Sequence, residues 1–200
     1  MITNIIAMIL FSFTMSITPG PVNITTFSSG INYGFRPTMP FVSGATIGFT
    51  LLLGFVGLGV GGIVAANPVA GKLLSYAGAI FIAYVGYNVM RTRVIVEKGS
   101  EKRPLFRHGF IMQWLNGKAW VACLAGVSAF SPDGSYSKLL LFCLIYFVVC
   151  YVSIACWALM GRYITKLLKD SMSIMIINNF LGLTLVGLAI LILLNSNMIN

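Results

Sequence analysis

The segment from Thr18 to Asn23, which reads Thr-Pro-Gly-Pro-Val-Asn, interrupts the first long apolar run of the chain. Pro19 and Pro21 lack a backbone N–H, and the Gly20 between them is the most flexible residue type, so a helix must break or kink here. In a bilayer, carbonyl groups freed by such a break must be satisfied by protein or by a water-lined cavity. The segment therefore predicts either a plain proline kink or, by analogy with the broken helices of transporters, a binding site.

The composition of the chain requires lipid as its solvent. Of the 200 residues, 58% are hydrophobic and only 8% are charged, and the mean hydropathy is +0.93. We therefore expect an integral membrane protein with a single transmembrane domain over residues 1–200 and no soluble domain. The net charge of +9 does not indicate a nucleic-acid partner, because most of the 13 Lys and Arg residues fall in three loops that alternate along the chain.

Six apolar segments are long enough to cross a bilayer, which takes about twenty residues in a helix. We expect an all-α fold with six transmembrane helices, over residues 3–28, 39–64, 70–90, 109–130, 138–160 and 172–194. Residues 30–37 form the first loop of this scheme, and Pro40 lies in the first turn of the second helix. Basic residues gather after the first, third and fifth helices, above all between Arg91 and His108. The positive-inside rule makes these loops cytoplasmic, so both termini are predicted to face outward.

A second interruption lies in the fourth predicted helix, where Gln113, Asn116, Gly117 and Lys118 break the apolar run. A lysine at the bilayer centre costs roughly 2.5–3.5 kcal/mol, and the rare charges at this depth usually line a cavity or pathway. The alternative is that Lys118 lies near an interface and extends its ammonium group into water. A rise of about 1.5 Å per residue places Lys118 close to the middle of the bilayer, which favours a functional role.

The two interruptions occupy matching places, because the first and fourth helices each begin a set of three. Two three-helix halves, about residues 1–95 and 105–200, necessarily insert with opposite orientations. Corresponding breaks in such halves are expected of an inverted-repeat transporter with a central site. The candidate substrate-binding residues are those at the breaks, namely Thr18, Pro19, Gly20, Pro21, Asn23, Gln113, Asn116 and Lys118.

Other residues that often mark function have structural explanations here. Gly44 and Gly48, one helical turn apart in the second predicted helix, favour close packing against a neighbour, although they also suit flexing during transport. The four cysteines fall within predicted helices without a CxxC pair, so we expect neither a metal site nor a cofactor. An enzyme is disfavoured, because the single histidine, His108, lies at an interface and no acidic residue lies within a predicted helix.

Several motifs together resemble the LysE/RhtB family of amino-acid exporters. The segment from Thr18 to Asn23, followed by the Gly34-Phe-Arg turn and the Gly44–Gly48 pair, resembles the N-terminal motif of that family. The run from Gln113 to Lys118 resembles its second motif, and the run from Cys156 to Gly161 resembles its fifth-helix segment. The last run and the Gly34-Phe-Arg turn are most similar to the branch that exports cysteine and O-acetylserine.

The resemblance implies export of small amino acids or derivatives, such as cysteine, O-acetylserine, homoserine or threonine, across the bacterial inner membrane, driven by the proton gradient. Lys118 would then bind the substrate carboxylate, while Asn23, Asn116 and the freed carbonyl groups would bind its ammonium group. The usual intramembrane carboxylate relay is missing, so coupling through Lys118, coupling through the substrate, and uniport stay open. A membrane-embedded interaction subunit and a narrow channel are the alternatives, and homo-oligomerisation also stays open.

Overall fold

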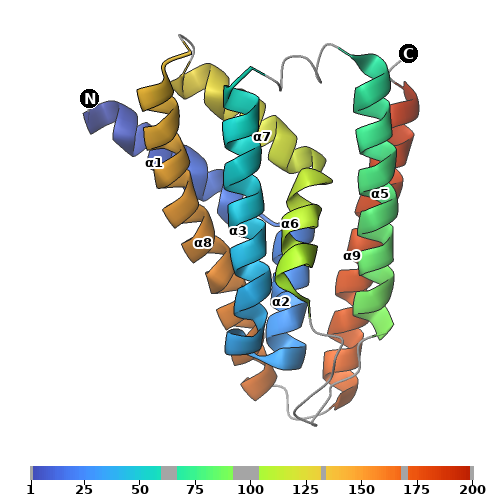
Figure 1. Ribbon diagram of the computed structural model, residues 1–200. Helices are drawn as coiled ribbons and strands as arrows, with labels where there is room; N and C mark the ends of the chain where they lie inside the picture. Colours follow the sequence, from blue (N-terminus) through green and yellow to red (C-terminus); the bar gives the residue numbers. More distant parts are fainter. Residues whose placement is uncertain (1, 60–66, 92–103, 132–133, 168–170, 199–200) are drawn as a thin grey trace.

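The structure, a computed structural model, describes residues 2–59, 67–91, 104–131, 134–167 and 171–198, and its regular elements there are all α-helices. In chain order the helices are α1 (Ile2–Ile17), α2 (Pro21–Tyr33), α3 (Phe35–Gly57), α5 (Pro68–Arg91), α6 (Phe106–Trp114), α7 (Gly117–Phe130), α8 (Tyr136–Leu167) and α9 (Ser171–Met198). Figure 1 shows a helical bundle in which α1 and α7 are inclined across the upper half. The predicted all-α fold is confirmed for the described residues.

Both predicted interruptions are breaks between helices. Pro21 begins α2, where its missing N–H is not needed, and the chain bends by 62° between α1 and α2. In the fourth predicted helix, α6 ends at Trp114 and α7 begins at Gly117. Asn116 caps α7, because its side-chain Oδ1 accepts a hydrogen bond from the backbone N–H of Lys118 at 3.2 Å. The two polar segments thus terminate helices in the middle of apolar runs.

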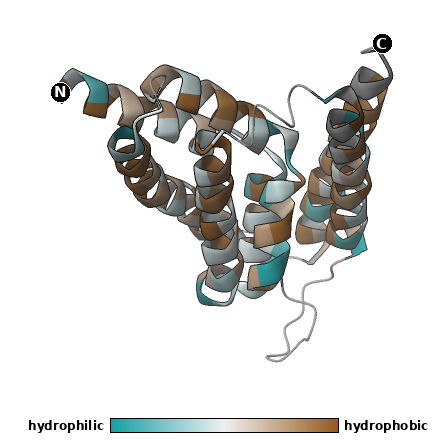
Figure 2. Ribbon diagram, turned by 45° about the horizontal axis from the view of Figure 1, so that its top comes forward, coloured by the Kyte–Doolittle hydropathy of each residue, from teal (hydrophilic) through white to brown (hydrophobic). Residues whose placement is uncertain are grey.

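The helices are suited to a membrane. Three described helices are long and apolar enough to cross a bilayer alone, namely α3, α8 over Tyr136–Thr165 and α9 over Met172–Leu194. The bent pair of α1 and α2 passes the same test as one span, and α5 fills the third predicted span with 24 residues. Figure 2 shows hydrophobic residues on the outer faces of the helices as well as between them. The chain is therefore a multi-pass membrane protein.

The connection between α2 and α3 is shorter than the predicted loop over residues 30–37. Only Gly34 separates the two helices, with a φ of 85° that glycine adopts without strain, and its N–H donates to Gly30 O at 3.1 Å. Pro40 consequently lies inside α3 rather than in its first turn, so that prediction is wrong. Tertiary contacts explain the difference, because polar Asn32 is kept in α2 by a buried amide partner on α9.

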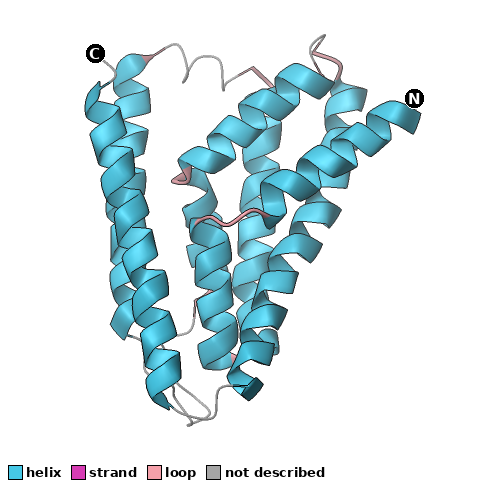
Figure 3. Cartoon of the chain, turned by 180° about the vertical axis from the view of Figure 1, so that it is seen from behind, coloured by secondary structure: helices cyan, strands magenta, loops and turns pink. Residues whose placement is uncertain are grey.

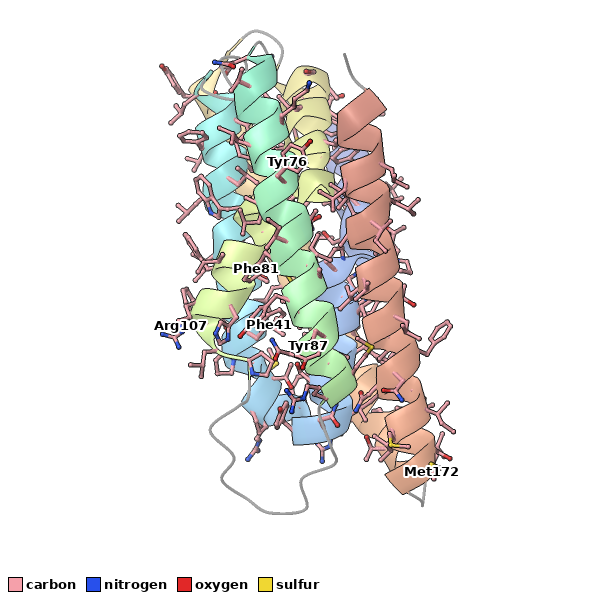
Figure 4. The ribbon with its side chains drawn as sticks, turned by 90° about the vertical axis from the view of Figure 1, so that its right-hand side faces the viewer. Phe41, Tyr76, Phe81, Tyr87, Arg107 and Met172 are labelled. Carbon is pink, nitrogen blue, oxygen red and sulfur yellow. The ribbon has the colours of Figure 1, made fainter. Side chains whose placement is uncertain are left out.

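The described helices pack around two hydrophobic cores. The larger core lies among α1, α2, α3, α6, α7 and α8, and its fully buried side chains include Phe41 and Phe142. In Figure 1, α5 and α9 stand side by side next to the other helices, and Figure 4 views this pair from its outer side. The smaller core holds the pair together through residues such as Ile82 and Leu185, and Ile24 connects it to α2.

A buried amide cluster also joins α9 to α2. Asn178 Nδ2 donates to Asn32 Oδ1 at 3.0 Å, and Asn178 Oδ1 accepts from Asn32 Nδ2 and from Ser28 Oγ, both at 3.1 Å. All three residues are buried, so these bonds satisfy groups that would otherwise be costly in an apolar interior. The α5–α9 pair is thus tied to the part of the first span that follows the break.

Glycine contacts hold α3 closely against α6, as the spacing of Gly44 and Gly48 predicts. A Cβ atom added at Gly44 would collide with the carbonyl oxygen of Phe106, and one at Gly48 would lie 2.9 Å from Phe110 O. A similar contact joins α2 to α8, where a Cβ atom at Gly30 would collide with the backbone of α8. Small residues at these positions let the helix backbones approach each other.

The helix ends define two ends of the bundle. In Figure 1, α1 begins and α9 ends at the top, whereas the α2–α3 turn, the end of α5 and the start of α6 lie at the bottom. Arg91 is the last residue of α5 and Arg107 lies in the first turn of α6, so both basic residues lie at this second end. Figure 4 labels Arg107 there. Most of the predicted basic loop, residues 92–103, lies outside the described residues. The start of α1 and the end of α9 share the other end, and its outward orientation stays a prediction.

Candidate functional site

The two helix breaks meet at Lys118. This residue is the second of α7, and its Nζ donates to the Thr18 carbonyl oxygen at 2.8 Å and to Thr18 Oγ1 at 2.7 Å. Its side chain passes Gly20, where an added Cβ atom would lie 3.4 Å from Lys118 Cδ. Figure 3 shows the two short loops that contain the breaks at mid-height in the bundle. Two segments 100 residues apart in the sequence are thus joined at this junction.

Side-chain donors satisfy the carbonyl groups at the end of α1. Asn23 Nδ2 donates to Ser16 O at 2.8 Å and to Thr18 O at 3.0 Å. Trp157 Nε1, from α8, donates to Ile17 O at 3.1 Å. The backbone groups freed by the proline break therefore find partners inside the protein, as an apolar surrounding requires. Of these carbonyl oxygens, Thr18 O accepts from two side chains, those of Asn23 and Lys118.

A small cavity adjoins the junction. Its volume is about 30 Å³, which is room for roughly two water molecules and too little for an amino acid. The polar part of its wall is formed by Ser16, Asn23, Gln113, Asn116 and Lys118, and the remainder includes Phe49, Tyr146 and Cys150.

The cavity wall is buried on the inside of the bundle, whereas the junction itself is open on one side. Asn23 and Gln113 are each 5% exposed and Asn116 is 7% exposed, while Thr18 lies exposed in the break. Lys118 lies between these extremes, with a half-buried side chain. Amide groups and one ammonium group thus surround the small cavity.

The described part of the site carries positive charge without a carboxylate partner. All acidic residues of the chain lie outside the described residues; they are Glu97, Glu101, Asp133 and Asp170. Among the described residues the Lys118 ammonium group is bonded to two neutral oxygens, and a carboxylate would add a charge–charge attraction that a neutral acceptor does not supply. The geometry can therefore hold an anionic group. Within the described ranges, no cluster of His, Cys, Asp or Glu is able to hold a metal ion.

The structure brings most of the predicted site residues together. The cavity is lined by five of them, namely Gly20, Asn23, Gln113, Asn116 and Lys118, and Thr18 is bonded to Lys118. Pro19 and Pro21 are not part of the cavity wall. Their contribution is to the backbone, because α1 ends before Pro19 and α2 begins at Pro21.

Sequence reasoning missed four residues at the junction. Ser16 lies before the break in an apolar run, and Tyr146 and Cys150 lie one turn apart in the apolar run of α8, so their patterns resemble ordinary core positions. Tyr146 is also stacked on Phe49, with ring centroids 4.2 Å apart. Trp157, which donates to Ile17 O, could have been found from the sequence, because it belongs to the fifth-helix segment that resembles the exporter family.

Comparisons with known proteins identify the family of the chain. The chain matches the family model described as LysE type translocator over residues 13–196. It is similar to the cysteine/O-acetylserine efflux protein of Escherichia coli (strain K12), with 26% identity over 164 residues that cover 80% of this chain and 83% of that protein. The protein of the same name from Shigella flexneri serotype 5b (strain 8401) is 26% identical over 174 residues, 84% of this chain and 88% of that one. No solved structure matches significantly. The chain belongs to the LysE family of translocators, which makes it a transporter rather than an enzyme.

Proposed function

We propose that the protein exports small amino acids or close derivatives across the bacterial inner membrane as a secondary-active transporter. The position of Lys118 carries this proposal, because its ammonium group joins two helix breaks beside a polar cavity. Helix ends that face a central site are typical of secondary transporters. The relatives are named cysteine/O-acetylserine efflux proteins, so cysteine and O-acetylserine are the first substrates to test, followed by homoserine and threonine.

An amino-acid zwitterion would replace the contact between Lys118 and Thr18. Its carboxylate would accept from Lys118 Nζ in place of the two Thr18 oxygens. Its ammonium group would donate to Thr18 O at the carboxyl end of α1, where the helix dipole favours positive charge. Both substrate charges would then have partners in a region where an unpaired charge is costly.

The remaining predicted residues would support this exchange. Asn23 keeps its hydrogen bond to Ser16 O, so the end of α1 stays in place when Thr18 O changes its partner. Asn116 holds the first turn of α7 through its bond to the Lys118 backbone, and thereby positions the lysine. Gln113 is available as a buried amide at the cavity wall. These roles differ from the predicted direct binding of the substrate ammonium group by Asn23 and Asn116.

Substrate binding would require the junction to open, because the cavity is smaller than an amino acid. We propose that residues 1–95 and 105–200 act as inverted halves that rock against each other. The main helix contacts run between the proposed halves, so these contacts would have to change in such a movement. α3 of the first half packs on α6 of the second at Gly44, and α8 of the second half packs on α2 of the first at Gly161.

The proton gradient is the proposed driving force. Because no acidic residue lies within the described helices, an intramembrane carboxylate relay does not supply the coupling there. Proton exchange at Lys118 and proton movement with the substrate are the two coupled routes, and uniport is the uncoupled one. Dependence of the flux on an imposed gradient separates the coupled routes from uniport.

Efflux from proteoliposomes tests the proposed function. The purified protein is reconstituted into proteoliposomes. The vesicles are loaded in turn with labelled cysteine, O-acetylserine, homoserine, threonine and lysine, and efflux is measured with and without a proton gradient. We expect saturable efflux of a small polar amino acid that the gradient accelerates, together with exchange against unlabelled substrate. A flux that never saturates would indicate a channel, and a folded protein that moves none of these amino acids would contradict the proposal.

A further inference from the structure

Ser16 carries a buried hydroxyl group that lies near the side chains of Tyr146 and Cys150 but forms no well-formed hydrogen bond with either. The residue is 7% exposed, and its Oγ has no hydrogen-bond partner among the described residues. An unpaired buried polar atom is costly and is rare in folded proteins, so it needs a physical explanation. A ligand that supplies the missing partner is one such explanation.

Neighbouring hydroxyl groups on the same broken helix behave differently. Ser12, one turn before Ser16, donates through its Oγ to Met8 O at 2.7 Å. Thr25 and Thr26 likewise donate to the carbonyl oxygens four residues earlier, at 2.8 Å and 2.7 Å. This local bond is a common arrangement for a hydroxyl group within a helix. Ser16 does not make it, although it lies within α1.

The position of Ser16 connects the unpaired hydroxyl group to the substrate site. Ser16 and Lys118 line the same small cavity. Asn23 donates to Ser16 O at 2.8 Å and so holds the backbone of Ser16 in place. The position of the Ser16 Cα atom relative to the cavity is therefore fixed. The other buried unpaired atoms in the described residues belong to Thr46 and Trp114, and neither residue lines this cavity.

We infer that Ser16 is a specificity-determining residue, which hydrogen-bonds a polar group in the side chain of the transported amino acid. The inference rests on the proposed function, in which Lys118 binds the substrate carboxylate. Because Ser16 and Lys118 line one small cavity, a substrate held by Lys118 places a short side chain within reach of Ser16. A hydroxyl group donates and accepts, so it suits a side-chain hydroxyl, thiol or ester oxygen.

An apolar side chain of the same size would be disfavoured. It would fill the space beside Ser16 and leave the serine hydroxyl group unpaired in the loaded state. Sites that are built to hydrogen-bond a substrate group discriminate against the analogue that lacks it for this reason. The preference should therefore appear between substrates of equal shape that differ only in one polar atom.

Isosteric pairs of amino acids test the assignment. Efflux of cysteine is compared with 2-aminobutyrate, and efflux of threonine with valine, in proteoliposomes of the wild type, Ser16→Ala and Ser12→Ala. We expect the wild type to favour the polar member of at least one pair in kcat/KM. Ser16→Ala should reduce that preference roughly three- to tenfold, the worth of one neutral hydrogen bond. Ser12→Ala should keep it, because Ser12 bonds only within its own helix.

Two outcomes would overturn the assignment while the proposed function stands. An active Ser16→Ala variant with an unchanged preference for the polar amino acid would show that the Ser16 hydroxyl group does not bind the substrate side chain. An equal loss in Ser12→Ala would show a general effect on α1. Should Ser16→Ala not fold, Ser16→Cys keeps the size with a weaker donor, and its preference should lie below that of the wild type. A wild type that transports no amino acid would overturn both proposals.

Discussion

Asn23 keeps the broken helix in shape with a single amide group. Its Nδ2 replaces lost helical donors at both Ser16 O and Thr18 O, and the residue is almost fully buried. Since Thr18 O also accepts from Lys118 Nζ, the same amide group borders the contact that the substrate is proposed to replace. Asn23 thus acts through the backbone of α1 and is a positioning residue.

We expect Asn23→Ala to lower the stability of the protein and its transport rate. The variant leaves Ser16 O without its side-chain donor, which costs about 1–3 kcal/mol for a buried group. Asn88→Ala is the matched control, because Asn88 Nδ2 also donates to a helix carbonyl, Tyr84 O at 3.0 Å, but at an exposed position. Melting curves of the purified proteins in detergent compare the two. Equal midpoints for both variants would contradict the role given to Asn23.

Among the residues at the junction, the sequence predicts those whose polarity contrasts with an apolar surrounding, and it does not predict those that resemble ordinary core residues. Lys118 and Asn116 are conspicuous because a charge and an amide interrupt an apolar run, and the structure places both at the junction. Tyr146 and Cys150 lie in an apolar helix where similar residues usually fill the core, so only the packing of α8 against α1 and α3 shows that they reach the cavity. The unpaired state of the Ser16 hydroxyl group is likewise a property of the folded chain.

Between elements, backbone contacts at glycines set the distance from α3 to α6. Gly44 faces the carbonyl oxygen of Phe106, whereas Gly54 on the same helix has no atom within 4 Å of an added Cβ. The two positions therefore separate the effect of close packing from the general effect of a glycine on helix propensity. Because α6 leads directly into the second break, the packing of α3 on α6 also positions Lys118.

Gly44→Ala should destabilise the protein, and Gly54→Ala should not. The added methyl group at Gly44 meets backbone atoms that cannot rotate away, so we expect a loss of about 1–3 kcal/mol, typical of overpacking. At Gly54 the methyl group enters open space, and the reduced flexibility of the unfolded chain makes the change neutral or slightly favourable. The detergent melting midpoints of both variants are the measurement. A Gly44→Ala midpoint at the wild-type value would rule out the close contact.

The helix breaks follow from local chemistry, and the turn between α2 and α3 does not. Proline and glycine terminate α1 wherever it lies, because the missing N–H groups are a property of the residues themselves. By contrast, residues 30–33 look like a turn in the sequence but stay helical. Their amide and glycine groups are used in contacts with α8 and α9, as Asn32 and Gly30 show. Tertiary packing therefore overrides local preference in this segment.

For the whole molecule, the arrangement of helix ends gives a prediction about topology. The start of α1 and the end of α9 share one end of the bundle, while Arg91 and Arg107 lie at the other. By the positive-inside rule the end with the basic residues faces the cytoplasm. The pairing of α5 with α9 beside the remaining helices is a feature that apolar segments alone do not predict, since every apolar face is an equally good partner in lipid.

Reporter fusions at the C-terminus test this orientation. We expect an alkaline phosphatase fusion to be active, because that enzyme needs the oxidising exterior, and a green fluorescent protein fusion to be dark. Fusions to the segment between α5 and α6 serve as the control and should show the reverse pattern. A fluorescent C-terminal fusion with an inactive phosphatase fusion would place the termini inside and contradict the assignment.

The central claim is that substrate binds where the two helix breaks meet, and Lys118 tests it most directly. Counterflow of labelled substrate is measured in proteoliposomes of the wild type, Lys118→Met and Lys138→Met, the last of which changes an exposed lysine at the start of α8. We predict that Lys118→Met loses counterflow by at least about a hundredfold while it inserts and folds, since the carboxylate loses its charged partner. Lys138→Met should transport normally. Wild-type counterflow in a folded Lys118→Met protein would contradict the account.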